Sequence, residues 1–157
     1  MSAGGYGSPK YDGSGSYEYL NNIEYVEFAT LGNAVDYGDL SISAYGASGG
    51  TSSSTRGIFA NLSVSPGTRQ NIIEFITIAT TGNTTDFGDM TTARAGSATS
   101  NSIRGIFMGG STNPSGAATN VIDFISIAST GDAKDFGDLL FAGRYASTIS
   151  DSHGGIE

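Results

Sequence analysis

The sequence predicts an all-β protein built from three copies of one unit. The motif Asp-x-Gly-Asp begins at Asp36, Asp86 and Asp135, with spacings of 50 and 49 residues. The 24 glycines and many β-branched residues stand in short runs between turn signals, which leaves almost no helical pattern. A unit of this size cannot bury its own apolar face, so we expect a stack or a ring of units.

The second copy shows how one unit is expected to fold. Residues 73–80 are β-branched and aromatic and predict a strand with two apolar faces. Gly82-Asn83 predicts a hairpin turn, after which the chain returns through residues 86–89. A polar stretch over 91–101 leads to a second apolar strand over 103–108. The unit therefore holds three or four short strands in about 49 residues.

The length of the unit and the order of its markers resemble the kelch repeats of β-propellers. The double glycine 109–110 is similar to the kelch double glycine, and the strand over 121–127 is similar to the kelch strand that carries a tyrosine. Phe87 and Phe136 stand where kelch repeats usually place a tryptophan. The chain departs from this pattern because it has no tryptophan and carries Asn61-Leu62 at the second double glycine.

The repeats also resemble tandem propeller-like modules in large tail and fibre proteins of phages that infect marine cyanobacteria. The element Asp-Phe-Gly-Asp-Leu, followed by Arg-Gly-x-Phe, carries this resemblance, which spans residues 23–154. It implies a virion component or an attachment module for a host surface, hence a virion or extracellular location. It does not imply an enzyme.

We expect one repeat domain over residues 1–157. Its repeats are expected at approximately 4–60, 61–108 and 109–157. Aligned on the repeat, residues 1–3 are the tail of a strand and residues 153–156 begin one. Propellers have about four to eight blades, so three blades cannot close a ring. We favour a homodimer with six blades; a fragment of a longer array and an open stack remain alternatives.

Composition excludes several classes of function. Fifteen acidic and seven scattered basic residues give a net charge of -8, so we expect no nucleic-acid partner. The chain has no cysteine, which excludes disulfides and thiolate metal sites. No stretch approaches the roughly 20 apolar residues of a membrane span, so we expect no membrane insertion. Residues 1–16 lack the apolar core of a secretory signal.

The sequence predicts no metal or cofactor site. The candidates for calcium ligands are the repeated pairs Asp36 with Asp39, Asp86 with Asp89, and Asp135 with Asp138. No Asp-x-Asp-x-Asp-Gly loop accompanies them. We favour the interpretation that these carboxylates hydrogen-bond turn amides, because they recur in every copy.

Two arginines occupy equivalent positions before apolar strands, Arg56 and Arg104, and His153 takes this position in the third copy. We expect each arginine to pair with an aspartate of the neighbouring unit and so to set the register; a solvent-facing arginine is the alternative. One histidine cannot form a multi-histidine metal site within one chain. The recurring aromatic residues, Phe87 and Phe136 among them, are expected in the core.

The candidates for ligand binding are four tyrosines unique to the first copy, Tyr6, Tyr11, Tyr17 and Tyr19. Exposed tyrosines among serine and glycine form good binding surfaces; the alternative is a loop without a ligand. The sequence contains no Gly-x-Ser-x-Gly elbow, Walker loop or Glu-x-x-His pair. We therefore expect a non-enzymatic structural or adhesive module that binds a surface glycan. The alternatives are a glycosidase that uses two carboxylates and a purely architectural fragment.

Overall fold

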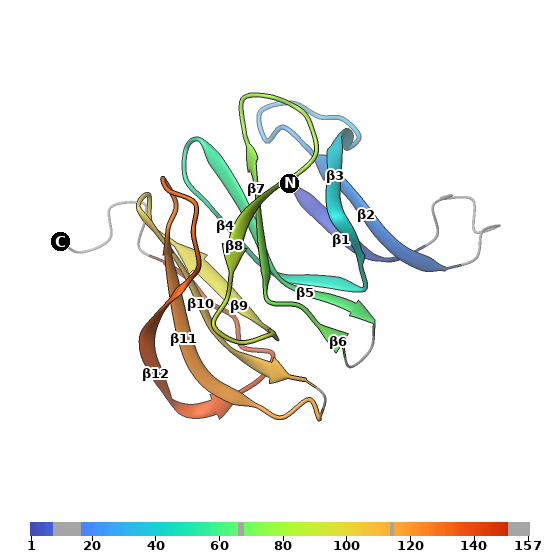
Figure 1. Ribbon diagram of the computed structural model, residues 1–157. Coiled ribbons are helices and arrows are strands. Elements are labelled where there is room, and N and C mark those ends of the chain that lie inside the picture. Colours follow the sequence, from blue (N-terminus) through green and yellow to red (C-terminus); the bar gives the residue numbers. More distant parts are fainter. Residues whose placement is uncertain (8–16, 66–67, 114, 151–157) are drawn as a thin grey trace.

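The computed structural model describes residues 1–7, 17–65, 68–113 and 115–150. Every regular element within these ranges is a β-strand, which confirms the all-β prediction. They form three antiparallel sheets that follow one another along the chain, and no sheet closes on itself (Figure 1). Within the same ranges no helix has the length and apolarity that crossing a membrane requires.

The first sheet has the strand order β1-β2-β3. Its strands are β1 (Ser2–Gly7), β2 (Glu18–Tyr25) and β3 (Val35–Ala44). β1 lies at one edge of this sheet and packs against β4 of the second sheet.

The second sheet has the order β4-β5-β7-β8, and the short β6 pairs with β5. Its strands are β4 (Gly46–Ser52), β5 (Arg56–Ser65), β6 (Thr68–Arg69), β7 (Ile72–Thr77) and β8 (Thr85–Asp89). The strand predicted over 73–80 is thus shorter. It ends at Thr77 because the carbonyl of Thr77 accepts the N–H of Thr80 at 3.0 Å, which starts a turn.

The third sheet has the order β12-β11-β10-β9. Its strands are β9 (Arg94–Ser100), β10 (Arg104–Thr112), β11 (Thr119–Ser126) and β12 (Lys134–Gly143). β9 packs against β4, its counterpart in the second sheet. By the same comparison β1 corresponds to β5 and β10, so the first sheet has no counterpart of β4 and β9 among the described residues.

The sheets begin at different points from the predicted repeats. The first runs over 2–44, the second over 46–89 and the third over 94–143. The predicted ranges start at the double-glycine strand, whereas the second and third sheets start one strand earlier. The polar stretch over 91–101 contains that strand, β9, which its serine, threonine and alanine content did not reveal.

The double-glycine position has one backbone conformation in all three units. Gly4 and Gly109 have φ values of 61° and 60°, and Asn61 has a φ of 58°. Asn is among the few residues other than glycine that tolerate this left-handed region. Asn61 therefore keeps the local geometry that the glycines adopt in the other two units.

The Asp-x-Gly-Asp motif lies within strands and not in turns. In the second sheet it falls in β8, where the pairing with β7 shifts register between Ile73 and Glu74. Gly88 takes up this irregularity with a φ of 142°. The expected turn carboxylates are therefore side chains of a bulged strand.

Two apolar cores fill the spaces between neighbouring sheets. The core between the first and second sheets contains Ile23, Tyr37, Leu40, Leu62 and Ile76. The core between the second and third contains Ile58, Ile73, Phe87, Phe107 and Ile125, with smaller neighbours. Phe87 is buried as expected, whereas the expectation was wrong for Phe136, which is exposed.

Candidate functional site

Four tyrosine rings form an exposed cluster on the first sheet and the start of the second. Tyr6 lies 5.6 Å from each of Tyr17, Tyr19 and Tyr45, measured between ring centroids. Tyr19 meets Tyr45 edge to face at 5.9 Å. All four side chains are exposed. We call this group the tyrosine cluster.

Strand pairing explains how the tyrosine cluster forms. Tyr6 on β1 is directly opposite Tyr19 on β2, and Tyr17 immediately precedes β2. Tyr45 lies between β3 and β4, where its N–H donates to the carbonyl of Ser63 at 2.5 Å. Three of the four tyrosines expected to bind a ligand, Tyr6, Tyr17 and Tyr19, thus lie in this one cluster. The fourth, Tyr11, lies outside the described residues.

Tyr45 joins the tyrosine cluster to a cavity of about 440 Å³, which we call the tyrosine–arginine cavity. Its lining combines aromatic rings, small residues, hydroxyl groups and one guanidinium group. The lining residues are Tyr45, Gly46, Ser63, Arg69, Ala95, Gly96, Ser97, Ser111, Tyr145 and Ala146. No carboxylate is among them.

Arg69 is the charged group of the tyrosine–arginine cavity. One guanidinium nitrogen, Nη2, donates to the Ser111 hydroxyl at 3.0 Å. The main chain of Arg69 is held by the Asn113 side chain, through two bonds of 2.7 Å. Nε and Nη1 of Arg69 are buried and have no hydrogen-bond partner in the described part of the chain. Among the described residues, no carboxylate bonds these nitrogens to neutralise the charge of the guanidinium group.

A second guanidinium group lies near the first. Arg144 donates to the carbonyl of Gly116 at 2.8 Å. A side chain built at Gly116 would come within 4 Å of both Arg69 and Arg144. This end of the sheets is therefore locally basic in a chain whose net charge is -8.

The aspartate pairs do not come together as a metal site. Within the described ranges no group of three or more His, Asp or Glu side chains is placed to hold a metal ion. Asp39 and Asp89 instead use their main-chain groups, each of which bonds a loop of the next sheet. Asp36, Asp86, Asp135 and Asp138 are exposed.

The repeated arginines each lie over an aromatic ring, and Arg56 also binds a main-chain carbonyl. Arg56 lies 4.6 Å from the ring centre of Phe75 and donates to the carbonyl of Ile127 in the third sheet at 2.8 Å. Its partner in the neighbouring unit is thus a carbonyl and not the expected aspartate. Arg104 lies 5.3 Å from the ring centre of Phe124. His153 lies outside the described residues.

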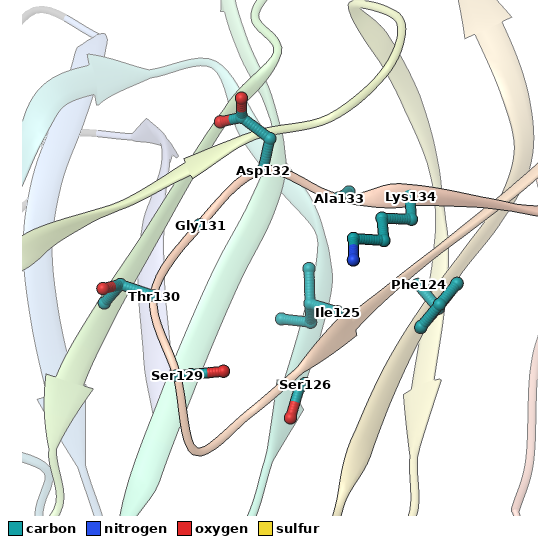
Figure 2. Close-up of a pocket in the computed structure, with 9 residues that line it drawn as sticks. All are labelled: Phe124, Ile125, Ser126, Ser129, Thr130, Gly131, Asp132, Ala133 and Lys134. Atoms are coloured by element: carbon teal, nitrogen blue, oxygen red, sulfur yellow. The ribbon is translucent and has the colours of Figure 1, made fainter.

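A hollow of about 400 Å³ lies between β11 and β12, where residues 129–134 loop over it (Figure 2). Figure 2 shows the Asp132 carboxylate turned away from this hollow. Smaller hollows occupy the same place beside residues 80–85 and 30–35. Because the hollow recurs in every unit, we assign it to the hairpin geometry and not to a ligand.

The sequence did not point to three residues of the tyrosine cluster and the tyrosine–arginine cavity, namely Tyr45, Arg69 and Tyr145. Tyr45 differs from Ala95, its counterpart in the second unit, so a comparison of the copies contains a signal for it. Arg69 and Tyr145 lie far apart in the sequence and line one cavity only in the fold.

No protein-family model matches this chain, and no curated protein matches it.

Proposed function

We propose that the chain is a non-enzymatic adhesion module of the β-propeller type, whose ligand is a surface glycan that carries carboxylate groups. The observation that carries this proposal is the continuity of the tyrosine cluster with the tyrosine–arginine cavity through Tyr45. The resemblance to phage tail and fibre repeats supports a virion as the location of the module.

The tyrosine cluster suits the apolar faces of sugar rings. Tyrosine offers a large, rigid contact surface at low entropic cost, together with a hydroxyl that hydrogen-bonds. Four rings that already touch each other need little rearrangement to receive a ligand. The cluster therefore supplies a preformed platform.

The tyrosine–arginine cavity suits the polar groups of a sugar acid. Ser63, Ser97 and Ser111 provide hydroxyls, and Arg69 provides a guanidinium group whose positive charge attracts a carboxylate. The positive charge of Arg69 and the nearby Arg144 favours an anion. The nearby groups thus favour an acidic sugar over a neutral one.

The same lining argues against a glycosidase. Hydrolysis of a glycosidic bond uses two carboxyl groups about 5 to 9.5 Å apart. The ten residues of the cavity lining contain neither aspartate nor glutamate. Binding without cleavage is the function that this chemistry supports.

The test is calorimetric titration of the purified chain with oligosaccharides that contain uronic acid and with the same oligosaccharides after carboxyl reduction. We expect the acidic forms to bind at least about tenfold more tightly, which is about 1.4 kcal/mol. Arg69→Gln and Tyr6→Ala should each weaken binding by a similar factor, whereas Lys134→Gln, on an exposed residue elsewhere, should not. Equal affinity for both forms, or release of reducing ends, would contradict the proposal.

A further inference from the structure

The first and second sheets meet through a fixed set of main-chain contacts. Gly82 N–H donates to the Tyr37 carbonyl at 2.8 Å, and Thr84 N–H donates to the Asp39 carbonyl at 2.9 Å. In return, Asp39 N–H donates to Asn83 Oδ1 at 3.1 Å. The loop between β7 and β8 thus pairs with β3 of the preceding sheet.

The second and third sheets repeat these contacts one unit later. Gly131 N–H donates to the Phe87 carbonyl at 2.7 Å, and Ala133 N–H donates to the Asp89 carbonyl at 2.8 Å. Asp89 N–H donates to Asp132 Oδ1 at 3.0 Å. The two interfaces between sheets therefore have the same hydrogen-bond pattern.

A buried carboxylate completes each interface. Glu74 accepts the N–H of Ser41 at 3.2 Å and also its hydroxyl. Asp123 accepts the N–H of Thr91 at 3.2 Å and its hydroxyl at 2.7 Å. Each carboxylate is thus held by a hydroxyl residue of the preceding sheet.

Both interfaces also need glycine in the Asp-x-Gly-Asp motif. A side chain at Gly38 would collide with the main chain of Gly82, and one at Gly88 would lie 2.5 Å from a main-chain atom of Gly131. A side chain at Gly137, the third glycine of this series, would meet nothing within 4 Å. Among the described residues, the third unit therefore presents the same surface without an occupant.

The face of the third sheet beyond β12 is apolar, and no described residue covers it. Phe136 is 53% exposed, whereas its counterparts Tyr37 and Phe87 are 5% and 2% exposed. Leu140 and Phe141 project from β12 and are almost fully exposed. This face, which we call the β12 face, matches the covered faces of β3 and β8 in position.

The opposite end of the chain has the complementary surface. It is the face of the first sheet that corresponds to the faces by which the second and third sheets pack on the sheet before them. Val26 is 48% exposed, whereas Ile76 and Ile125 at the same position are buried. Phe28 and Leu31 beside it are fully exposed. We call this the β2 face; it includes the loop 32–34, which corresponds to loops 82–84 and 131–133.

The two ends of the chain are also complementary in their strands. Residues 144–150 follow β12 and lie beside β9, with Thr148 Oγ1 donating to the Ala98 carbonyl at 2.5 Å and Ser97 donating to Ala146. They therefore lie where the first strand of a fourth sheet would start. The first sheet leaves the outer edge of β1 unpaired among the described residues, and this edge corresponds to the side of β5 and β10 that binds β4 and β9.

We propose that two copies of this chain join head to tail, with the β12 face of each copy on the β2 face of the other. Gly32 N–H then donates to the Phe136 carbonyl, Ala34 N–H to the Asp138 carbonyl, and Asp138 N–H to Asn33 Oδ1. Residues 144–150 of one copy add to β1 of the other. This pairing goes beyond glycan binding and does not rest on it.

Two copies are the number that the geometry favours. A head-to-tail interface makes a closed ring when its rotation closes and an open filament when it does not. Two chains supply six sheets, which is within the roughly four to eight of closed β-propellers, whereas three chains would supply nine.

The new interface differs chemically from the two internal ones. Leu140 stands where Ser41 and Thr91 provide hydroxyl groups, so Glu24 receives only a main-chain donor from that position. The apolar side chains of the β12 face instead meet Val26, Phe28 and Leu31. Burial of apolar side chains therefore supplies most of the attraction between copies.

The first test is the mass of the full chain, measured by light scattering during size-exclusion chromatography. The chain mass is 16.0 kDa, so a closed pair has twice that mass. We expect the doubled mass at micromolar concentration, without further growth as concentration rises. A mass of one chain, or one that increases steadily with concentration, overturns the closed pair.

Two variants separate head-to-tail pairing from other contacts. Leu140→Asp alters only the β12 face and Phe28→Asp only the β2 face, and both side chains are exposed within one copy, so each variant should fold. We expect each to raise the dissociation constant at least about tenfold. Ile78→Ser, at the position of Phe28 in the middle unit, is the control and should leave it unchanged.

Mixing the two variants gives the decisive result. A mixed pair has one intact interface, formed by the unaltered β12 face of one copy and the unaltered β2 face of the other. The mixture should therefore associate more tightly than either variant alone. If one variant has no effect, or if mixing restores nothing, the copies do not join head to tail.

Discussion

Thr91 donates both its main-chain N–H and its hydroxyl to the carboxylate of Asp123 on the neighbouring sheet, and the hydroxyl lies 2.7 and 2.9 Å from the two oxygens. Arg94 binds the same carboxylate at 2.8 Å, and both charged side chains are fully buried. These donors offset the free-energy cost of removing the carboxylate from water. The group links two sheets through one anion.

Replacement of this anion should destabilise the fold strongly. Asp123→Ala leaves the Arg94 charge buried without a partner, so we expect the free energy of unfolding to fall by about 3 to 5 kcal/mol. Urea denaturation followed by circular dichroism measures this loss. Asp86→Asn, at an exposed carboxylate of the second sheet, should change it by less than about 0.5 kcal/mol. Equal effects would show that Asp123 is not a structural link.

The left-handed conformation of Asn61 predicts an unusual order of substitutions. Asn61→Ala should be less stable than Asn61→Gly by about 1 kcal/mol, because a Cβ at a φ of 58° is strained and alanine lacks the compensation that asparagine has. At ordinary positions in strands, alanine is the more stable of the two. Thermal unfolding of both variants decides the order. A more stable alanine variant would mean that the chain relaxes to a negative φ there.

Gly88 and Gly137 have similar φ values of 142° and 139° but different surroundings. Gly88→Ala places a side chain against the main chain of Gly131, so we expect it to destabilise the chain by about 2 kcal/mol more than Gly137→Ala. Chemical denaturation at a concentration where the chain is monomeric isolates this difference. At higher concentration Gly137→Ala should weaken association between copies. Equal destabilisation would indicate that backbone strain alone explains both.

Tyr37 predicts an alkaline limit to stability. Its single O–H is shared between the carbonyls of Thr77 and Thr80, which lie 2.5 and 2.6 Å from the hydroxyl oxygen, and burial raises its pKa above the ordinary value of 10.0. The folded state therefore favours the protonated phenol. The stability from this preference is fully present below about pH 10 and is lost as the pH rises through the higher pKa of the folded state.

Tyr37→Phe should remove this pH dependence and cost about 1 to 2 kcal/mol at neutral pH, because the buried carbonyls lose the phenol O–H that they share. Ultraviolet titration of the phenol groups, together with denaturation at pH 8 to 11, measures both effects. Tyr17→Phe is the control, since its hydroxyl is exposed. A variant that keeps the alkaline loss of the parent would assign that loss to another group.

The all-β class could be predicted because it depends on local chemistry, whereas Asn61-Leu62 stands out in the sequence as a departure from the pattern although the local chemistry of asparagine matches that of the glycines. The run of β-branched residues in each copy and the tolerance of asparagine for positive φ are properties of short segments. The left-handed φ of Asn61 follows from the position that the repeat assigns to it.

The exposure of Phe136 and the Arg94–Asp123 pair could not be predicted in the same way. Phe136 has the same sequence surroundings as Phe87, and they differ only in whether another sheet covers them. Arg94 has no charged counterpart in the other units, where the register places Ala44 and Gly143. Such features depend on which sheets and residues lie beside each unit. The sequence pattern shared by the copies contains no information about these neighbours.

The loops 78–84 and 128–133 also determine where this chain can change in length. Each bonds the preceding sheet through main-chain atoms at two residues in a fixed spacing and through the side chain of Asn83 or Asp132, so the residue count cannot change, while the other side chains there can vary. An added residue would move one N–H out of reach of its carbonyl and alter the spacing of the sheets. Loops without such bonds to another sheet, such as the one between β9 and β10, are where evolution or an engineer can insert new sequence and leave the arrangement of sheets intact.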